Sequence, residues 1–177
     1  AEKGRFQTIF EGLDGSLYSV RNSEKICVFQ LDNLGLHLRD SLPIGGLVNG
    51  FYENSTGKLL YFATSNGIVR IGKSKGSKPV YVTNQNGLPG NYIAGLLADT
   101  AANFWLGTNK GLAYFNRNDS LRVFALADGM QSTGFHLQAA LKLRNGDLWF
   151  GGSNGITIVP AGGLPPDVKT KPKVQLT

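Results

Sequence analysis

The chain has 177 residues, 24 of them glycine, and a formal net charge of +6 at neutral pH. Hydrophobic residues make up 41% of the chain, which excludes an intrinsically disordered protein and suffices for a folded core. The lysines cluster at 73–78 and 169–173 with no aromatic residue among them, so we expect no nucleic-acid partner. No apolar run approaches the roughly 18 residues that a membrane-spanning helix needs.

Residues 1–41 are predicted to form a divergent repeat unit. The segment 14–20 places Tyr18 43 residues before Tyr61, but the turn that follows it, 22–25, lacks a glycine. Cys27 lies in the apolar run 26–29, which indicates a buried structural thiol. Because it is the only cysteine, no intrachain disulfide can form.

Three clearer repeats follow with a period of 44 residues. Tyr61, Trp105 and Trp149 keep this spacing, each at the start of a short apolar run. A glycine closes the turn six residues after each aromatic residue, as in Thr108 to Gly111. The structural positions predicted from this pattern are Tyr61, Gly67, Trp105, Gly107, Gly111, Trp149, Gly151 and Gly155.

Each repeat is predicted to contain four short strands. In the third repeat they cover 92–97, 104–107, 112–115 and 121–126, with a glycine-containing turn between the second and third. Ala94 and Gly95 in the first strand are small enough for the crowded centre of a propeller. Four-stranded units at this period, without helical periodicity, predict an all-β propeller of about four blades.

The fourth repeat has no obvious outer strand, because a Pro- and Gly-rich segment follows residue 159. We therefore expect part of a larger, seven-bladed ring. The predicted boundaries are a divergent blade at 1–41, blades at 42–83 and 84–127, a final blade without its outer strand at 128–160, and a hinge at 161–177.

Two stretches resemble the regulator-propeller repeats in the periplasmic sensors of bacterial hybrid two-component systems. One is Asn86-Gly87-Leu88-Pro89-Gly90-Asn91-Tyr92-Ile93, followed by the segment 104–112, which contains the second strand and its hairpin turn. The other is the segment 128–136 followed by 145–155. In that family a Pro-rich hinge leads into an immunoglobulin-like domain. The segment 165–177 resembles this hinge and the start of the first strand of that domain.

The resemblance implies a function for the chain. We expect a non-enzymatic, periplasmic, ligand-sensing segment of a membrane-anchored sensor histidine kinase with phosphorelay output. The resemblance also implies a homodimeric parent and an oligosaccharide or other small-molecule ligand. A polysaccharide lyase with this fold, or a pure interaction scaffold, remains the alternative.

In a propeller, the turns between second and third strands share a face with the linkers into each blade. Asn66 lies on this face, where amide, aromatic and imidazole side chains can bind a sugar. The alternative is that such side chains only satisfy the turn backbones. The predicted ligand-binding residues are Asn91, Tyr92, Asn109, Lys110, Phe135, His136 and Asn154.

Other candidate chemistry is weaker. The segment 151–155 fits the G-x-S-x-G pattern of a nucleophile elbow, but a strand rather than a helix is predicted after Ser153. Trp105 and Trp149 would suit sugar stacking, yet their fixed place in the repeat favours a position between blades. His37 and His136 lack metal-ligand spacing, so we expect no metal or cofactor.

Overall fold

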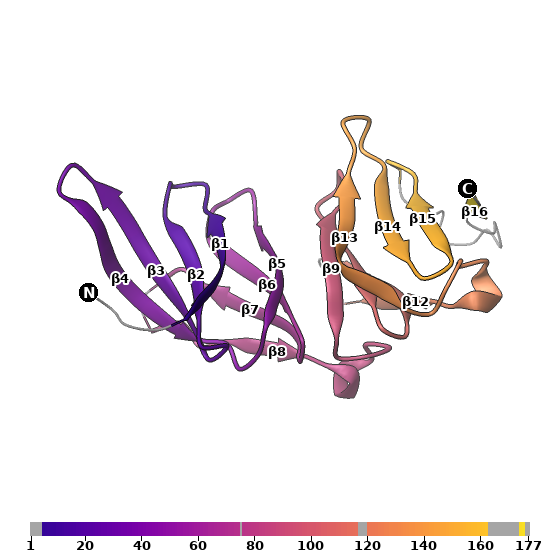
Figure 1. Ribbon diagram of the computed structural model, residues 1–177, viewed down its shortest axis with the longest axis horizontal. Helices are drawn as coiled ribbons and strands as arrows, with labels where there is room; N and C mark the ends of the chain where they lie inside the picture. The colour runs from indigo at the N-terminus through magenta and orange to yellow at the C-terminus, as the bar shows by residue number, and fades with distance from the viewer. Residues whose placement is uncertain (1–4, 75, 117–119, 163–173, 176–177) are drawn as a thin grey trace.

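A computed structural model describes residues 5–74, 76–116, 120–162 and 174–175. These residues form four antiparallel sheets of four strands, each in sequence order (Figure 1). The first sheet contains β1 (Phe6–Glu11), β2 (Leu17–Arg21), β3 (Lys25–Asp32) and β4 (Gly35–Pro43). The second contains β5 (Val48–Glu53), β6 (Leu59–Thr64), β7 (Gly67–Gly72) and β8 (Val80–Val82). The third contains β9 (Ile93–Ala98), β10 (Phe104–Thr108), β11 (Gly111–Phe115) and β12 (Leu121–Phe124). The fourth contains β13 (Phe135–Lys142), β14 (Leu148–Gly152), β15 (Gly155–Val159) and β16 (Val174–Gln175).

This architecture confirms the all-β prediction. The only helical elements described are two short 3-10 turns, η1 (Asn84–Asn86) and η2 (Leu126–Asp128), which lie in the linkers before β9 and β13. No helix in the described part of the chain is long and apolar enough to cross a membrane.

The hairpin turns between second and third strands confirm the glycine pattern. Gly111 has φ +126° and sits against the carbonyl of Phe124, so no side chain fits there. Without a glycine, the first blade makes the same turn with Asn22 and Ser23 at φ 52° and 60°. Asn tolerates this region better than most residues, which lets the divergent blade keep the hairpin.

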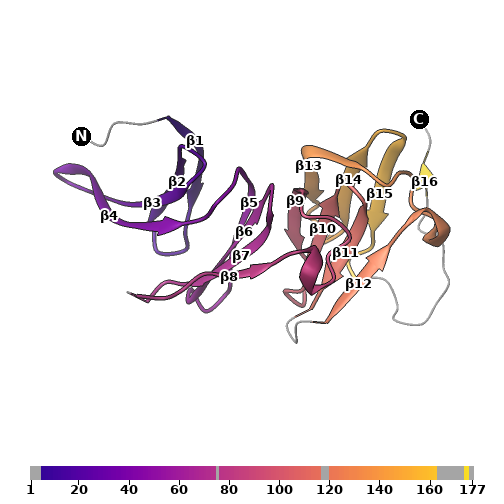
Figure 2. The same cartoon turned by 90° about the horizontal axis from the view of Figure 1, so that it is seen from below.

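The four sheets follow one another as an arc, with β1, β5, β9 and β13 as the inner strands (Figure 2). The inner strands β5, β9 and β13 contact each other directly. A Cβ added at Gly95 would lie 2.7 Å from the Cβ of Ala140, which is closer than real side chains approach. The predicted crowding at the centre is therefore real at Gly95.

A hydrophobic core fills each interface between neighbouring blades. The repeated aromatic residue of the second strand packs at each of these interfaces. Tyr18 of the first blade stacks on Phe51 of the second at 5.3 Å. Tyr61 of the second blade lies 4.5 Å from Phe104 of the third. Trp105 of the third blade is 1% exposed in a core that includes residues of the fourth. The 44-residue period thus places a blade-to-blade contact at each step.

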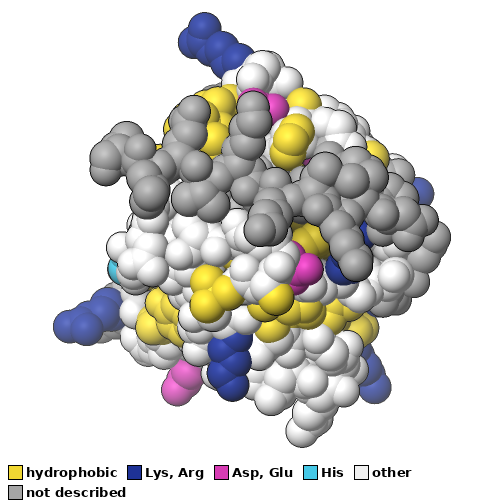
Figure 3. Space-filling model, turned by 90° about the vertical axis from the view of Figure 1, so that its right-hand side faces the viewer, with side chains coloured by type: hydrophobic (Ala, Val, Ile, Leu, Met, Phe, Trp, Pro, Cys, Tyr) yellow, Lys and Arg dark blue, Asp and Glu magenta, His cyan; other side chains and the backbone are white. Residues whose placement is uncertain are grey.

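Trp149 differs from this pattern. It occupies the equivalent place in the ladder, opposite Ile158, but no fifth sheet packs on it within the described residues. Its Nε1 has no acceptor there, whereas the Nε1 of Trp105 donates to Asp99 at 3.4 Å. The described residues contain no further blade that could pack on Trp149, so its predicted place between blades stays a prediction. Figure 3 views this end of the molecule, where apolar side chains show between polar ones.

The last blade also differs from its predicted form. Val174 and Gln175 pair with Thr157 and Ile156 of β15, so the sheet has a short fourth strand. The predicted absence of this strand, and of a partner for the edge of β15, is corrected. The repeat spacing does not reveal this strand, because 14 residues separate β15 from β16, against five between β11 and β12. The hinge predicted at 161–177 otherwise lies mainly outside the described residues, and the boundaries remain predictions.

Candidate functional site

One side of the arc carries both the linkers between blades and the turns between second and third strands. Main-chain hydrogen bonds join the two, as from Ser65 N to the Leu47 carbonyl at 2.9 Å and from Asn109 N to the Tyr92 carbonyl at 3.3 Å. In the fourth blade, Asn154 N donates to the side-chain oxygen of Gln131 at 3.1 Å. We call this surface the linker face; it consists of the linkers 44–47, 83–92 and 125–134 and the turns 22–24, 65–66, 109–110 and 153–154. Its role in ligand binding stays a prediction.

Two of the predicted ligand-binding residues on the linker face have structural roles. The side-chain oxygen of Asn91 accepts a hydrogen bond from Asn84 N at 2.6 Å, which ties the linker to itself. Phe135 is 6% exposed and its ring packs edge-on against Phe150 at 5.9 Å. Its prediction as a ligand contact is corrected, because a ring in the core cannot stack on a ligand.

The remaining predicted residues are accessible. Tyr92 is half-buried beside the core of the third and fourth blades. Asn109, Lys110, His136 and Asn154 are exposed. Among the described residues, His136 contacts the Ser153 hydroxyl at 3.5 Å. The side-chain amides of Asn109 and Asn154, the Lys110 ammonium and the His136 imidazole are therefore exposed on this face.

A wide bulge in β13 adds residues that sequence reasoning missed. Phe135 pairs with Gly152 and Ala140 with Phe150, so five steps along β13 match only two along β14. The loop between them exposes Leu137 and Gln138, and Gln138 has φ 59°. The inner strands β5 and β9 also have register shifts, but smaller ones. Bulges of this kind commonly re-aim side chains beside functional sites.

The Ser153 turn does not have the geometry of a nucleophile elbow. Gly152 and Gly155 pair directly across a two-residue hairpin, and the strand β15 follows. The 3.5 Å between Ser153 Oγ and His136 Nε2 is long for an O–H···N hydrogen bond. In the nucleophile-elbow pattern the histidine follows the serine, so the pattern does not point to His136, which precedes Ser153. No cluster of three or more potential metal ligands occurs among the residues that the structure describes.

The opposite side of the arc holds grooves between blades. Those between the first and second blades and between the third and fourth have volumes of about 470 and 460 Å³. Tyr114 lines the second of these, and burial raises the pKa of its hydroxyl. Neither groove contains a predicted ligand-binding residue.

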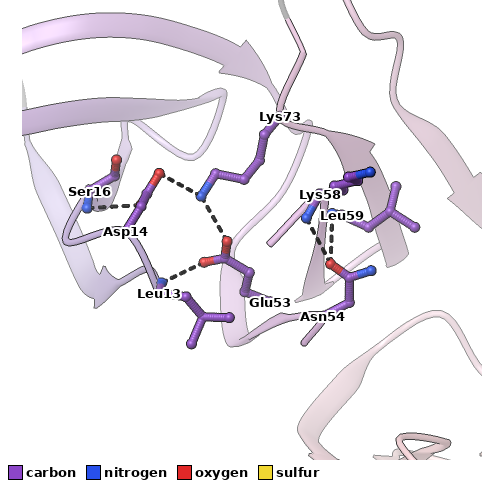
Figure 4. Close-up of polar contacts among 8 residues, drawn as sticks. All are labelled: Leu13, Asp14, Ser16, Glu53, Asn54, Lys58, Leu59 and Lys73. Atoms are coloured by element: carbon purple, nitrogen blue, oxygen red, sulfur yellow. Dashed lines mark hydrogen bonds and ion pairs between the residues drawn. The ribbon is translucent and has the colours of Figure 1, made fainter. Parts of the chain in front are cut away.

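An ion cluster joins the first and second blades beside the first of these grooves, which Asp14 and Lys73 line (Figure 4). Lys73 Nζ lies 2.8 Å from Asp14 of the first blade and 2.7 Å from Glu53 of the second. The buried Glu53 carboxylate also accepts a hydrogen bond from Leu13 N at 2.8 Å. The Lys73 hydrogen bond lowers the pKa of Asp14 to about 2. Because every charge in it has a partner, this cluster joins two blades rather than offering a ligand site.

The chain was compared with family models, with known sequences and with solved structures. The chain matches no family model. Histidine kinase P4 of Formosa agariphila is 31% identical over 72 residues, which are 40% of this chain and 5% of that protein.

Two solved structures illustrate the structural likeness. The extracellular domain of a hybrid two-component system from B. thetaiotaomicron superimposes with a TM-score of 0.71 at 19% identity, over 85% of this chain and 21% of that one. Virginiamycin B lyase from Staphylococcus aureus superimposes with a TM-score of 0.68 at 15% identity, over 95% of this chain and 58% of that one. At these identities the likeness establishes a propeller segment.

Proposed function

We propose that the chain is a ligand-sensing segment of the extracytoplasmic part of a two-component sensor. The similarity to a histidine kinase and the fold shared with an extracellular two-component domain support this proposal. In this proposal the parent is a membrane-anchored, homodimeric kinase of the regulator-propeller family, and the segment itself is not an enzyme.

The linker face is the proposed ligand site, and the exposed bulge of β13 is the observation that carries the proposal. His136 and Gln138 present hydrogen-bonding groups there, and Leu137, 52% exposed, presents an apolar surface beside them. Asn154 lies on the turn next to this bulge, because Ser153 contacts His136. Hydrogen-bonding groups beside an apolar side chain suit a glycan fragment, which carries hydroxyls on a ring with apolar faces.

A glycan array followed by calorimetric titration tests this function. We expect an oligosaccharide to bind the wild-type chain, and His136→Ala and Asn154→Ala each to weaken binding at least tenfold. Asn33→Ala, an exposed amide in the β3–β4 turn, is the matched control and should bind as the wild type does. Binding that survives both linker-face changes would place the site elsewhere.

The same screen separates the alternatives. Virginiamycin B lyase, which shares the fold, is an enzyme, so an enzymatic alternative is worth testing. A polysaccharide lyase would release unsaturated, ultraviolet-absorbing products from the oligosaccharide. A scaffold would bind no oligosaccharide at all. Turnover of any bound glycan by the wild-type chain would overturn the non-enzymatic assignment.

A further inference from the structure

The outer hairpin of the first blade is longer than its counterparts. β3 and β4 have eight and nine residues, whereas the outer strands β8 and β12 have three and four. The last pair between β2 and β3 is Leu17 with Phe29, yet β3 and β4 continue through three further pairs. At about 3.3 Å per residue, the hairpin extends roughly 10 Å past the rest of its blade. It is the free-standing hairpin at the left of Figure 1.

One side of this extension is apolar. Leu31 pairs with Leu36 and Phe29 with Leu38, so their side chains share one face, and Leu34 lies in the turn. The exposed fractions are 63% for Leu31, 89% for Leu34, 54% for Leu36 and 39% for Leu38. We call these four residues the leucine face. The intervening pair, Gln30 with His37, points to the other side, where Gln30 lines the groove toward the second blade.

The tip is locally held in shape. Asp32 accepts a hydrogen bond from Leu34 N at 2.8 Å and pairs with His37 Nε2 at 3.1 Å. The turn therefore has a defined geometry in which Leu34 points to solvent.

Another blade of the ring would not cover this surface. In the second and third blades the third strand ends level with the second, at Leu59 with Gly72 and at Phe104 with Phe115. A neighbouring blade built in this way would reach Phe29 but end short of Leu31, Leu34 and Leu36. The outer part of the leucine face, which is Leu31, Leu34 and Leu36, is thus distinct from the surfaces that stack blades, whereas Leu38 lies level with Phe29.

We propose that the leucine face is a self-association surface, on which the same face of a second copy packs about a two-fold axis. A surface without charge complements itself, and a two-fold contact pairs identical patches. Asp32 places a carboxylate at the tip, and Arg39 is the only Lys or Arg on β4, so this surface lacks the cluster of cations that an anionic membrane would attract. Two such faces would bury on the order of 1,000 Å² of surface in total. This area is at the small end of the range for specific interfaces, so we expect a weak dimer.

Sedimentation velocity on the 177-residue chain over a wide concentration range tests this inference. We expect a monomer–dimer equilibrium, and Leu36→Asp should raise its dissociation constant at least tenfold. Leu126→Asp is the matched control, since Leu126 is 56% exposed in η2, and it should leave the equilibrium unchanged. Leu34→Asp, in the turn, repeats the test if Leu36→Asp lowers the melting temperature.

Three results would overturn the inference. The wild-type chain could stay monomeric at every concentration, or the dimer could persist in both Leu34→Asp and Leu36→Asp. The third is loss of the dimer in Leu141→Asp, which changes the open face of the fourth blade. Cross-linking gives a second readout. Oxidised Leu34→Cys should form a covalent dimer, whereas the wild type should not, because Cys27 is 1% exposed.

Discussion

Replacing the buried tryptophan between the third and fourth blades tests how the blades are stacked. Trp105 is 1% exposed, and its ring lies 4.8 Å from Tyr114 and 5.6 Å from Phe124. Truncation of such a side chain to alanine removes its burial and leaves a cavity, so Trp105→Ala should cost about 4 kcal/mol of unfolding free energy. For a chain of this size that corresponds to a melting temperature lower by roughly 8–16 °C.

Trp149→Ala is the matched comparison. Trp149 occupies the same ladder position but is half-buried, on a face that no described sheet covers. We expect this change to cost only about 1–2 kcal/mol. Thermal and urea unfolding followed by circular dichroism measures both variants without depending on tryptophan fluorescence. Equal losses for the two variants would refute the reasoning, because they would require the open face of the fourth blade to be covered in solution.

Three further changes test other parts of the structure. Gly95→Val should destabilise the chain by about 1–3 kcal/mol, because its Cβ would meet that of Ala140 at 2.7 Å; Gly134→Ala, with no atom within 4 Å of the added Cβ, should be nearly neutral in the same denaturation assay. Asp14 has its pKa lowered from 3.8 to about 2 in the folded state, so its contribution is present above pH 4 and lost as the pH falls toward 2. Because Asp14 is half-exposed we expect only about 0.5–1 kcal/mol from it, and Asp14→Asn, which leaves Lys73 paired with Glu53, should flatten stability across this pH range; an unchanged pH profile would rule out the contribution of the ion pair. Ser153→Ala should leave any hydrolytic activity unchanged, and labelling of Ser153 by a fluorophosphonate probe would contradict this.

Much of the fold could be predicted because its determinants are local and repeated. The aromatic positions at Tyr61 and Trp105 and the turn glycines recur at one spacing, and each repeat forms one sheet. The linker face followed from propeller connectivity alone. Gly95 was identified as a residue of the crowded centre from its size and place in the inner strand.

The features that were missed depend on contacts that have no local signal. β16 pairs across a long intervening segment, so spacing did not reveal it. The bulge in β13 arises from extra residues in a strand whose ends are both paired, and the burial of Phe135 depends on Phe150 in the next strand. The leucine face was hidden because Leu31, Leu34, Leu36 and Leu38 alternate with polar residues as in an ordinary half-buried strand.

The central claim is that the linker face binds the ligand, and a chemical-shift map of the ¹⁵N-labelled chain tests it most directly. On titration with the oligosaccharide selected by the array, we predict that the largest amide shifts fall on His136, Leu137, Gln138 and Asn154, with smaller ones at Tyr92 and Asn109. Shifts that cluster instead around Asp99, Tyr114 and Arg122, in the groove between the third and fourth blades on the opposite side, would contradict the account.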